Sequence, residues 1–229
     1  MLTVGIDAGF ECCKIVLLRD RNILFHFVAP YGAGSADNLA RLMLKRVILE
    51  TGISDKYIEY VIAVGNRKNS ITIANETATD SICCARGANL LDPSVTSIVD
   101  LGSEKCLALA CKEGRALKSR RNSRCAAGTG RYLRILLKSL FFTSDQVAEI
   151  ASTCAVFAES EIISLLHQGV KPASIVRGVF ISLCHRIHSM LISLNWQPPL
   201  MMVGGYAENT GIVQAREEQV QERIVAPKF

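Results

Sequence analysis

The chain has 229 residues, 49% of them hydrophobic and 21% charged, and a formal net charge of +5. That length accommodates one large core or two smaller lobes around a cleft, and the composition is that of a compact globular protein. No apolar run approaches the roughly 18 residues that span a bilayer, and the N-terminus lacks the basic-then-apolar order of a signal peptide. We therefore expect a cytoplasmic protein that does not span a membrane.

The N-terminal segment predicts strands. Residues 2–24 alternate in polarity around Asp7-Ala8-Gly9, which indicates two strands joined by a tight turn in which Gly9 adopts a conformation that other residues resist. A short apolar strand is expected within residues 57–65. Another apolar strand is expected in "LMMVGGYAEN", where it runs into a glycine turn.

Helices are predicted between and after these strands. Residues 35–52 have apolar positions at helical spacing, with Ser35 or Asp37 as the N-cap and Gly52 at the end. The second half of the chain is dominated by helical patterns, which we expect at about 129–141, 144–151, 155–168 and 172–195.

The strand-turn-strand segment occurs twice. "DAGFECCKIVLLRDRNIL" from Asp7 and "DLGSEKCLALACKEGRAL" from Asp100 align without gaps at an offset of 93 residues. Repetition of such a unit predicts two similar lobes, which we place at residues 1–95 and 96–229, whereas chance similarity of two hairpins is the alternative. The coinciding pairs are Asp7/Asp100, Gly9/Gly102, Glu11/Glu104, Cys13/Cys106 and Leu24/Leu117.

Nine cysteines are present, and none of them forms a Cys-x-x-Cys pair. Two adjacent pairs suit a disulfide framework poorly, so buried thiols in a reducing compartment are the simplest interpretation for most of them. Cys125 and Cys154 differ, because each directly precedes a predicted helix. For these two, packing and chemistry remain alternatives at this point.

A basic run, "GRALKSRRNSR", leads up to Cys125. A solvated loop is the simplest interpretation of such a run. Nucleic-acid binding is not expected, because no aromatic residues stand between the charges.

The two Asp-x-Gly turns suit a nucleotide. Their backbone N–H groups can face phosphate oxygens, Asp7 and Asp100 can hold Mg²⁺ through water, and Lys14 can add a positive charge. Glycines at a helix start favour the approach of an anion. The residues expected to contact the nucleotide are Gly9, Lys14, Gly102, Gly128, Thr129, Gly130, Gly204 and Gly205, with the last two beside the adenosine.

This set resembles the actin, Hsp70 and sugar-kinase superfamily, which implies a two-lobed α/β fold of duplicated RNase H-like lobes with a nucleotide cleft between them. Within it, "NSRCAAGTGRYL", "STCAVFAESEIISLLHQG" and "VGGYAENTGIV" resemble the BadF/BadG/BcrA/BcrD ATPase family, the activators of 2-hydroxyacyl-CoA dehydratases and ATPase subunits of benzoyl-CoA reductase. The resemblance extends from about residue 3 to residue 213.

The resemblance implies a homodimer that shares one [4Fe–4S] cluster, held by Cys125 and Cys154 of each subunit. Two thiolates are half of a four-thiolate set, which a two-fold dimer completes. The anionic cluster would face helix N-termini. The family implies that ATP hydrolysis drives a low-potential electron from a donor such as ferredoxin or flavodoxin into a partner dehydratase or reductase.

The chain departs from the family pattern in both loops. The first reads Phe10-Glu11-Cys12-Cys13-Lys14 where the family offers hydroxyls, and the second has Ser103-Glu104-Lys105 in place of Gly-Gln-Asp. The chain also ends before the small-residue segment that closes the family's nucleotide lobe. Two alternatives follow: a degenerate paralogue that keeps the cluster but hydrolyses ATP poorly, and a small-molecule kinase in which the cysteines are incidental.

Overall fold

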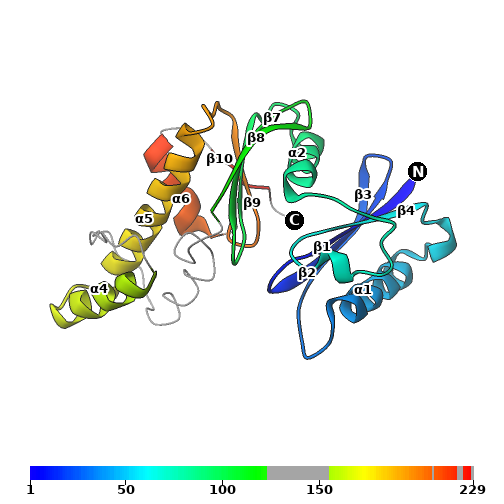
Figure 1. Ribbon diagram of the computed structural model, residues 1–229, viewed down its shortest axis with the longest axis horizontal. Helices are drawn as coiled ribbons and strands as arrows, with labels where there is room; N and C mark the ends of the chain where they lie inside the picture. The colour runs from blue at the N-terminus through cyan, green and yellow to red at the C-terminus, as the bar shows by residue number, and fades with distance from the viewer. Residues whose placement is uncertain (123–154, 208, 221–223, 228–229) are drawn as a thin grey trace. The chain divides into compact units, whose positions relative to one another are not determined.

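A computed structural model describes residues 1–122, 155–207, 209–220 and 224–227. The chain divides into two compact units, Met1–Cys83 and Cys84–Phe229, and each is built on a five-stranded sheet (Figure 1). Helix α2 (Asp80–Leu91) belongs mostly to the second unit, whereas the sequence placed it in a first lobe ending at residue 95. The predicted helices at 129–141 and 144–151 lie outside the described residues.

The first unit contains a mixed sheet covered by helix α1 (Ala36–Thr51). Its two central strands place alternate residues in the core, as the polarity pattern predicted, and α1 contributes Ala40, Met43 and Val47. In sheet order the strands are β3 (Asn22–Pro30), β2 (Cys12–Arg19), β1 (Leu2–Ala8), β4 (Tyr60–Val64) and β5 (Glu76–Thr77).

The ends of α1 are defined by local chemistry. The Ser35 hydroxyl accepts a hydrogen bond from the Asn38 amide at 3.2 Å, so Ser35 is the N-cap. Gly52 ends the helix in the left-handed region, with φ +67°, and its amide donates to the carbonyl of Ile48. Asp37, the other candidate cap, instead lies in the first turn and pairs with Arg41.

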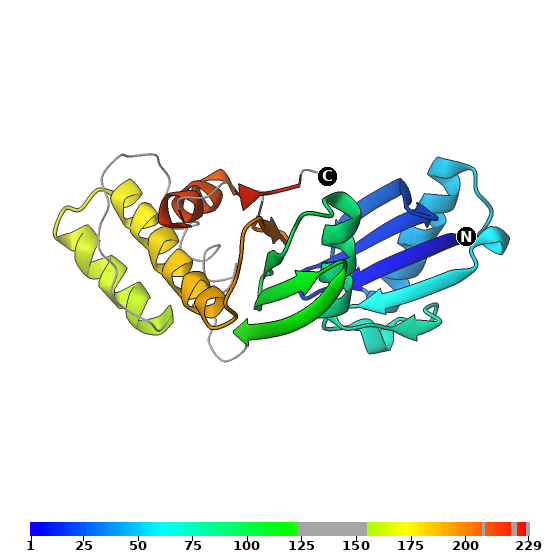
Figure 2. The same ribbon diagram turned by 90° about the horizontal axis from the view of Figure 1, so that it is seen from above.

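The second unit has helices on both faces of its sheet (Figures 1 and 2). Helix α2 packs on one face, and α5 (Pro172–Ile192) and α6 (Thr210–Val220) pack on the other, with α4 (Ala155–His167) against α5. In sheet order the strands are β10 (Ile224–Val225), β9 (Leu200–Val203), β6 (Ser97–Leu101), β7 (Cys106–Lys112) and β8 (Arg115–Asn122).

Helix α5 is long and apolar enough to cross a membrane by length and composition alone. Core helices of soluble proteins pass the same test. Ten residues of α5 are buried in the second unit, among them Ile175, Val179, Leu183 and Ile187. These side chains form the largest apolar cluster with β6 and β7, which accounts for the hydropathy of the helix.

The predicted repeat is confirmed by strand register. In the first unit Asp7 on β1 lies opposite Lys14 on β2, and in the second Asp100 on β6 lies opposite Leu107 on β7, both at the offset of 93 residues. The third strands, β3 and β8, begin at Asn22 and Arg115, which share that offset. The two hairpins therefore repeat each other residue by residue.

Candidate functional site

The first Asp-x-Gly loop, Asp7–Cys12, joins β1 to β2. The Gly9 amide donates to the carbonyl of Cys12 at 3.1 Å, and a Cβ on Gly9 would lie 3.0 Å from that oxygen, which is a tight contact. Gly9 does not have a positive φ, so the predicted conformation that other residues resist is not observed there. The Lys14 ammonium group donates to Asp7 Oδ2 at 2.7 Å. Both side chains are more than a third exposed, so the loop offers a paired carboxylate and ammonium to solvent.

The second loop, Asp100–Lys105, joins β6 to β7 in the same way. The Gly102 amide donates to the carbonyl of Lys105 at 2.9 Å, which matches the turn at Gly9. The residue equivalent to Lys14 is Leu107, so no lysine stands at that position on β7. The Cys84 thiol lies 4.0 Å from Asp100 Oδ2.

Each aspartate packs against a glycine from a distant strand end. Gly65 follows β4 with φ +96°, and a Cβ on it would lie 2.5 Å from both Asp7 Oδ1 and the Ala8 carbonyl oxygen. Gly204 follows β9 with φ +94°, and a Cβ there would lie 2.5 Å from Asp100 Oδ1. The sequence indicated Gly204 and missed Gly65, although "AVGN" and "MVGG" share the signal of a glycine directly after an apolar strand.

Replacing Gly204 by alanine is expected to destabilise the protein by about 3 kcal/mol, because the new Cβ would overlap the Asp100 carboxylate in a backbone conformation that alanine resists. Thermal unfolding of Gly204→Ala measures the loss. Gly205→Ala is the matched control, since a Cβ at Gly205 meets nothing within 4 Å. Equal unfolding temperatures for the two variants would contradict the packing described here.

The sequence interpretation, in which backbone N–H groups of the two turns face phosphate oxygens, stays a prediction. Both the Gly9 and the Gly102 amides donate to carbonyls within their own turns. Phosphate oxygens would therefore need other groups on these loops, and Lys14 is one cation in place for this role.

Four of the seven described cysteines are buried, in keeping with the packing interpretation. Burial raises the pKa of Cys13 to about 11 and that of Cys106 to about 12, with a further increase from the nearby Asp7 and Asp100 carboxylates. Protonated thiols are poor metal ligands. Among the described residues, no group of three or more His, Cys, Asp or Glu side chains is placed to hold a metal ion.

Arg216 on α6 is fully buried, which no sequence signal indicated because a lone arginine in a helix is ordinarily exposed. Burial lowers the pKa of Arg216 to about 10, whereas the nearby Cys184 and Cys106 act to raise it. Arg216 and Asp100 both influence Cys106, so a buried cation lies beneath the strand pair that carries the second loop.

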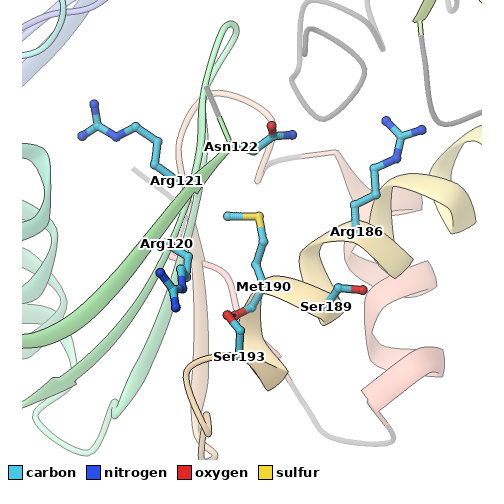
Figure 3. A pocket seen from close by; sticks show the side chains of 7 residues that line it. All are labelled: Arg120, Arg121, Asn122, Arg186, Ser189, Met190 and Ser193. Atoms are coloured by element: carbon cyan, nitrogen blue, oxygen red, sulfur yellow. Dashed lines mark hydrogen bonds between the residues drawn. The ribbon is translucent and has the colours of Figure 1, made fainter. Parts of the chain in front are cut away.

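The described part of the basic run includes a strand, residues 115–122, and is not the loop that the sequence suggested. It forms β8, the edge strand of the second sheet, and its charged residues are exposed, which is typical of an edge protected from further pairing. Arg120 and Arg121 line a hollow of about 430 Å³ with Arg186 of α5, and the charged ends of Arg121 and Arg186 extend away from each other (Figure 3). The hollow contains none of the predicted site residues.

The remaining predicted site residues lie outside the described ranges, and they stay predictions. They include the two proposed cluster ligands, and helix α4 begins at Ala155, directly after the second of these in sequence. The residues concerned are Cys125, Gly128, Thr129, Gly130 and Cys154.

Two α/β units with Asp-x-Gly hairpins at the same register define the class of actin-like, nucleotide-binding proteins, and the predicted fold class is confirmed. Sugar kinases and other proteins of this class align at 10–14% identity with TM-scores of 0.52–0.62, which shows the shared fold alone. The chain belongs to the BadF/BadG/BcrA/BcrD ATPase family, whose model matches residues 4–228.

Several relatives in this family are activators of acyl-CoA dehydratases. The activator of lactoyl-CoA dehydratase from Anaerotignum propionicum is 33% identical over 99% of this chain and 92% of its own. The activator of the 2-hydroxyisocaproyl-CoA dehydratase from Clostridium difficile, solved with bound ADPNP, is 32% identical and has a TM-score of 0.90 over 100% of this chain and 89% of its own. Component A of (R)-2-hydroxyglutaryl-CoA dehydratase from Acidaminococcus fermentans has a TM-score of 0.92 at 29% identity, over 99% and 92% of the two chains.

Proposed function

We propose that this protein is an ATP-dependent activator that passes a low-potential electron to a partner 2-hydroxyacyl-CoA dehydratase or benzoyl-CoA reductase-type enzyme. The observation that carries the proposal is the pair of Asp-x-Gly loops at one register, each packed against a glycine, in a chain of this ATPase family. The ADPNP-bound relative supports ATP as the nucleotide.

The two loops have different tasks in this proposal. Asp100 binds Mg²⁺ through water, because carboxylate oxygens are ligands that Mg²⁺ prefers. Asp7 orients Lys14 through their 2.7 Å ion pair, and the ammonium group faces the phosphates as a positive charge. Gly65 and Gly204 keep both carboxylates in place, since any larger residue would displace them.

The electron carrier in this proposal is a [4Fe–4S] cluster shared by two copies of the chain through Cys125 and Cys154. The cluster supplies one-electron chemistry at low potential. The sequence places both cysteines directly before helical patterns, and partial positive charge at a helix N-terminus would favour an anionic cluster. The donor would be a small redox protein such as ferredoxin or flavodoxin.

A second candidate is the degenerate paralogue, which keeps the cluster and the dimer but hydrolyses ATP poorly. It is favoured by the turn hydrogen bonds that occupy the Gly9 and Gly102 amides. Glu11 and Glu104 point to the same candidate, because carboxylates beside phosphates repel them in the absence of a metal ion.

Anaerobic purification followed by two measurements tests the proposal. We expect iron with a visible absorption that dithionite bleaches, together with magnesium-dependent ATP hydrolysis. Iron without hydrolysis would establish the degenerate paralogue. Hydrolysis or phosphoryl transfer to a sugar by protein that contains no iron would contradict both and establish the kinase alternative.

A further inference from the structure

Arg67 contacts the first loop, Asp7–Cys12, from the end of β4. Strand β4 pairs with β1 on the side away from β2, the strand that carries Lys14. Arg67 follows Gly65 after β4, and its amide donates to the Ala8 carbonyl at 2.9 Å. Its guanidinium group donates a long hydrogen bond of 3.4 Å to the Phe10 carbonyl. Two main-chain carbonyls of the loop are thus bonded by one residue, which lies 57 positions after Phe10 in the sequence.

Tyr31 completes this arrangement. Its ring lies beneath the Arg67 guanidinium group, 4.3 Å from the ring centroid to the guanidinium carbon, and its amide donates to the Glu11 carbonyl at 3.0 Å. The ring also packs against the core of the first unit. We call Arg67 and Tyr31 together the clamp. The main-chain amides of Arg67 and Tyr31 donate to the Ala8 and Glu11 carbonyls, whereas the bond to the Phe10 carbonyl and the stacking of the guanidinium group on the ring depend on the side chains.

The second unit has the same main-chain contact with a different side chain. Tyr206 stands two residues after Gly204, as Arg67 stands two after Gly65, and its amide donates to the Leu101 carbonyl at 3.4 Å. A tyrosine brings no charge to this position, so the guanidinium contact distinguishes the first loop from the second. A side chain that differs between two otherwise repeated loops is a candidate for a function specific to one of them.

We propose that Arg67 is a positioning residue for nucleotide binding, which acts by holding the loop Asp7–Cys12 against Tyr31 in the conformation that presents Asp7 and Lys14 to the phosphates. This inference rests on the proposed ATP site at the first loop. The Gly9 amide is occupied within its turn, so phosphate recognition there depends on side chains whose place is set by the loop. If the loop samples other conformations, the apparent affinity for the nucleotide falls in proportion to the fraction of molecules in the binding-competent conformation.

Arg67→Ala is therefore expected to raise the KM for ATP about fivefold to tenfold and to change kcat by less than about twofold. Loss of folded protein alone would lower kcat and leave KM unchanged. Arg67→Lys is expected to resemble Arg67→Ala, because an ammonium group lacks the planar guanidinium fork and stacks poorly. If Arg67→Lys had the wild-type KM, the clamp would be wrong, because a simple attraction between the positive charge and the phosphates would then explain the effect of Arg67→Ala.

A double-mutant cycle with Tyr31→Leu tests the coupling within the clamp. The double variant is expected to have nearly the KM of either single variant, because each change removes the same contact. Fully additive effects on KM would overturn the inference. Arg46→Ala is the matched control: it removes a guanidinium group that lies 4.0 Å from the Phe27 ring on the same unit, and it should leave KM unchanged.

Hydrogen exchange separates this inference from the proposed function. Amides of residues 9–12 are expected to exchange faster in Arg67→Ala than in the wild type or in Arg46→Ala, with no nucleotide present. Unchanged exchange in this segment would overturn the clamp. If the wild-type protein neither binds nor hydrolyses ATP, the proposed function fails, while the exchange experiment still decides whether Arg67 holds the loop.

Discussion

Replacing Asp100 by asparagine is expected to lower the rate of ATP hydrolysis about a hundredfold while it changes ATP affinity by less than about threefold. Asparagine preserves the size of the side chain beside Gly204 and removes only its negative charge. In the proposed site the charge acts on Mg²⁺ and on the metal-bound water that the reaction needs, whereas the predicted adenosine contacts are uncharged glycines. Steady-state hydrolysis and nucleotide binding by calorimetry measure the two effects separately.

Asp92→Asn is the matched control in the same unit. Asp92 lies in an exposed turn, where its side chain accepts hydrogen bonds from the Ser94 amide at 2.9 Å and the Ser94 hydroxyl at 2.6 Å. An asparagine oxygen can accept the same bonds, so hydrolysis should not change. If Asp100→Asn hydrolysed ATP at the wild-type rate, Asp100 would not be part of the catalytic site. If binding and hydrolysis fell by the same factor, Asp100 would contribute to ATP affinity and not to the hydrolysis step.

Replacing Cys125 or Cys154 by serine is expected to abolish iron binding altogether. If each chain supplies two of four thiolates, either change leaves a two-fold dimer with only two, which cannot hold a four-iron cluster. Iron analysis of anaerobic protein should give about four irons per dimer in the wild type and none in either variant. Full iron content in either variant would refute the assignment.

Cys83→Ser is the control for this experiment, because Cys83 is one of the partly exposed cysteines that is not a proposed ligand. It should retain its iron. The same samples test the dimer by size-exclusion chromatography, where loss of iron is expected to give a monomer. Facing helix N-termini and nearby arginines would then repel each other without the anionic cluster between them. A dimer that persists without iron at micromolar concentration would show that packing holds the pair.

Local pattern was sufficient to predict both hairpins, whereas the class of fold was predicted from the resemblance of the motifs to a known superfamily. Alternation of polar and apolar residues around Asp7 and around Asp100 specifies strand, turn and strand over adjacent positions, and the offset of 93 residues then matched the observed register. Helix α1 was equally local, because Ser35 and Gly52 terminate it through contacts with residues three and four positions away. The sequence predicted only two strands over residues 2–24, whereas the chain turns again after Arg19 and forms a third strand, β3, which runs to Pro30.

The contacts that hold the candidate site depend on distant segments. Strands β4 and β9 pair in parallel with β1 and β6, and only this pairing brings Gly65 to Asp7 and Gly204 to Asp100. Arg67 likewise reaches the first loop across the sheet.

What the sequence by itself determined about this protein is the chemistry available at each hairpin, because residue type and spacing along a single strand specify it. The tertiary structure alone decided which side chains meet there. It paired Asp7 with Lys14, placed the uncharged Cys84 thiol beside Asp100, and buried Arg216 beneath the second loop. The last two contacts arise from helices packed on the second sheet, and packing between elements far apart in the chain leaves no periodic signal in either one.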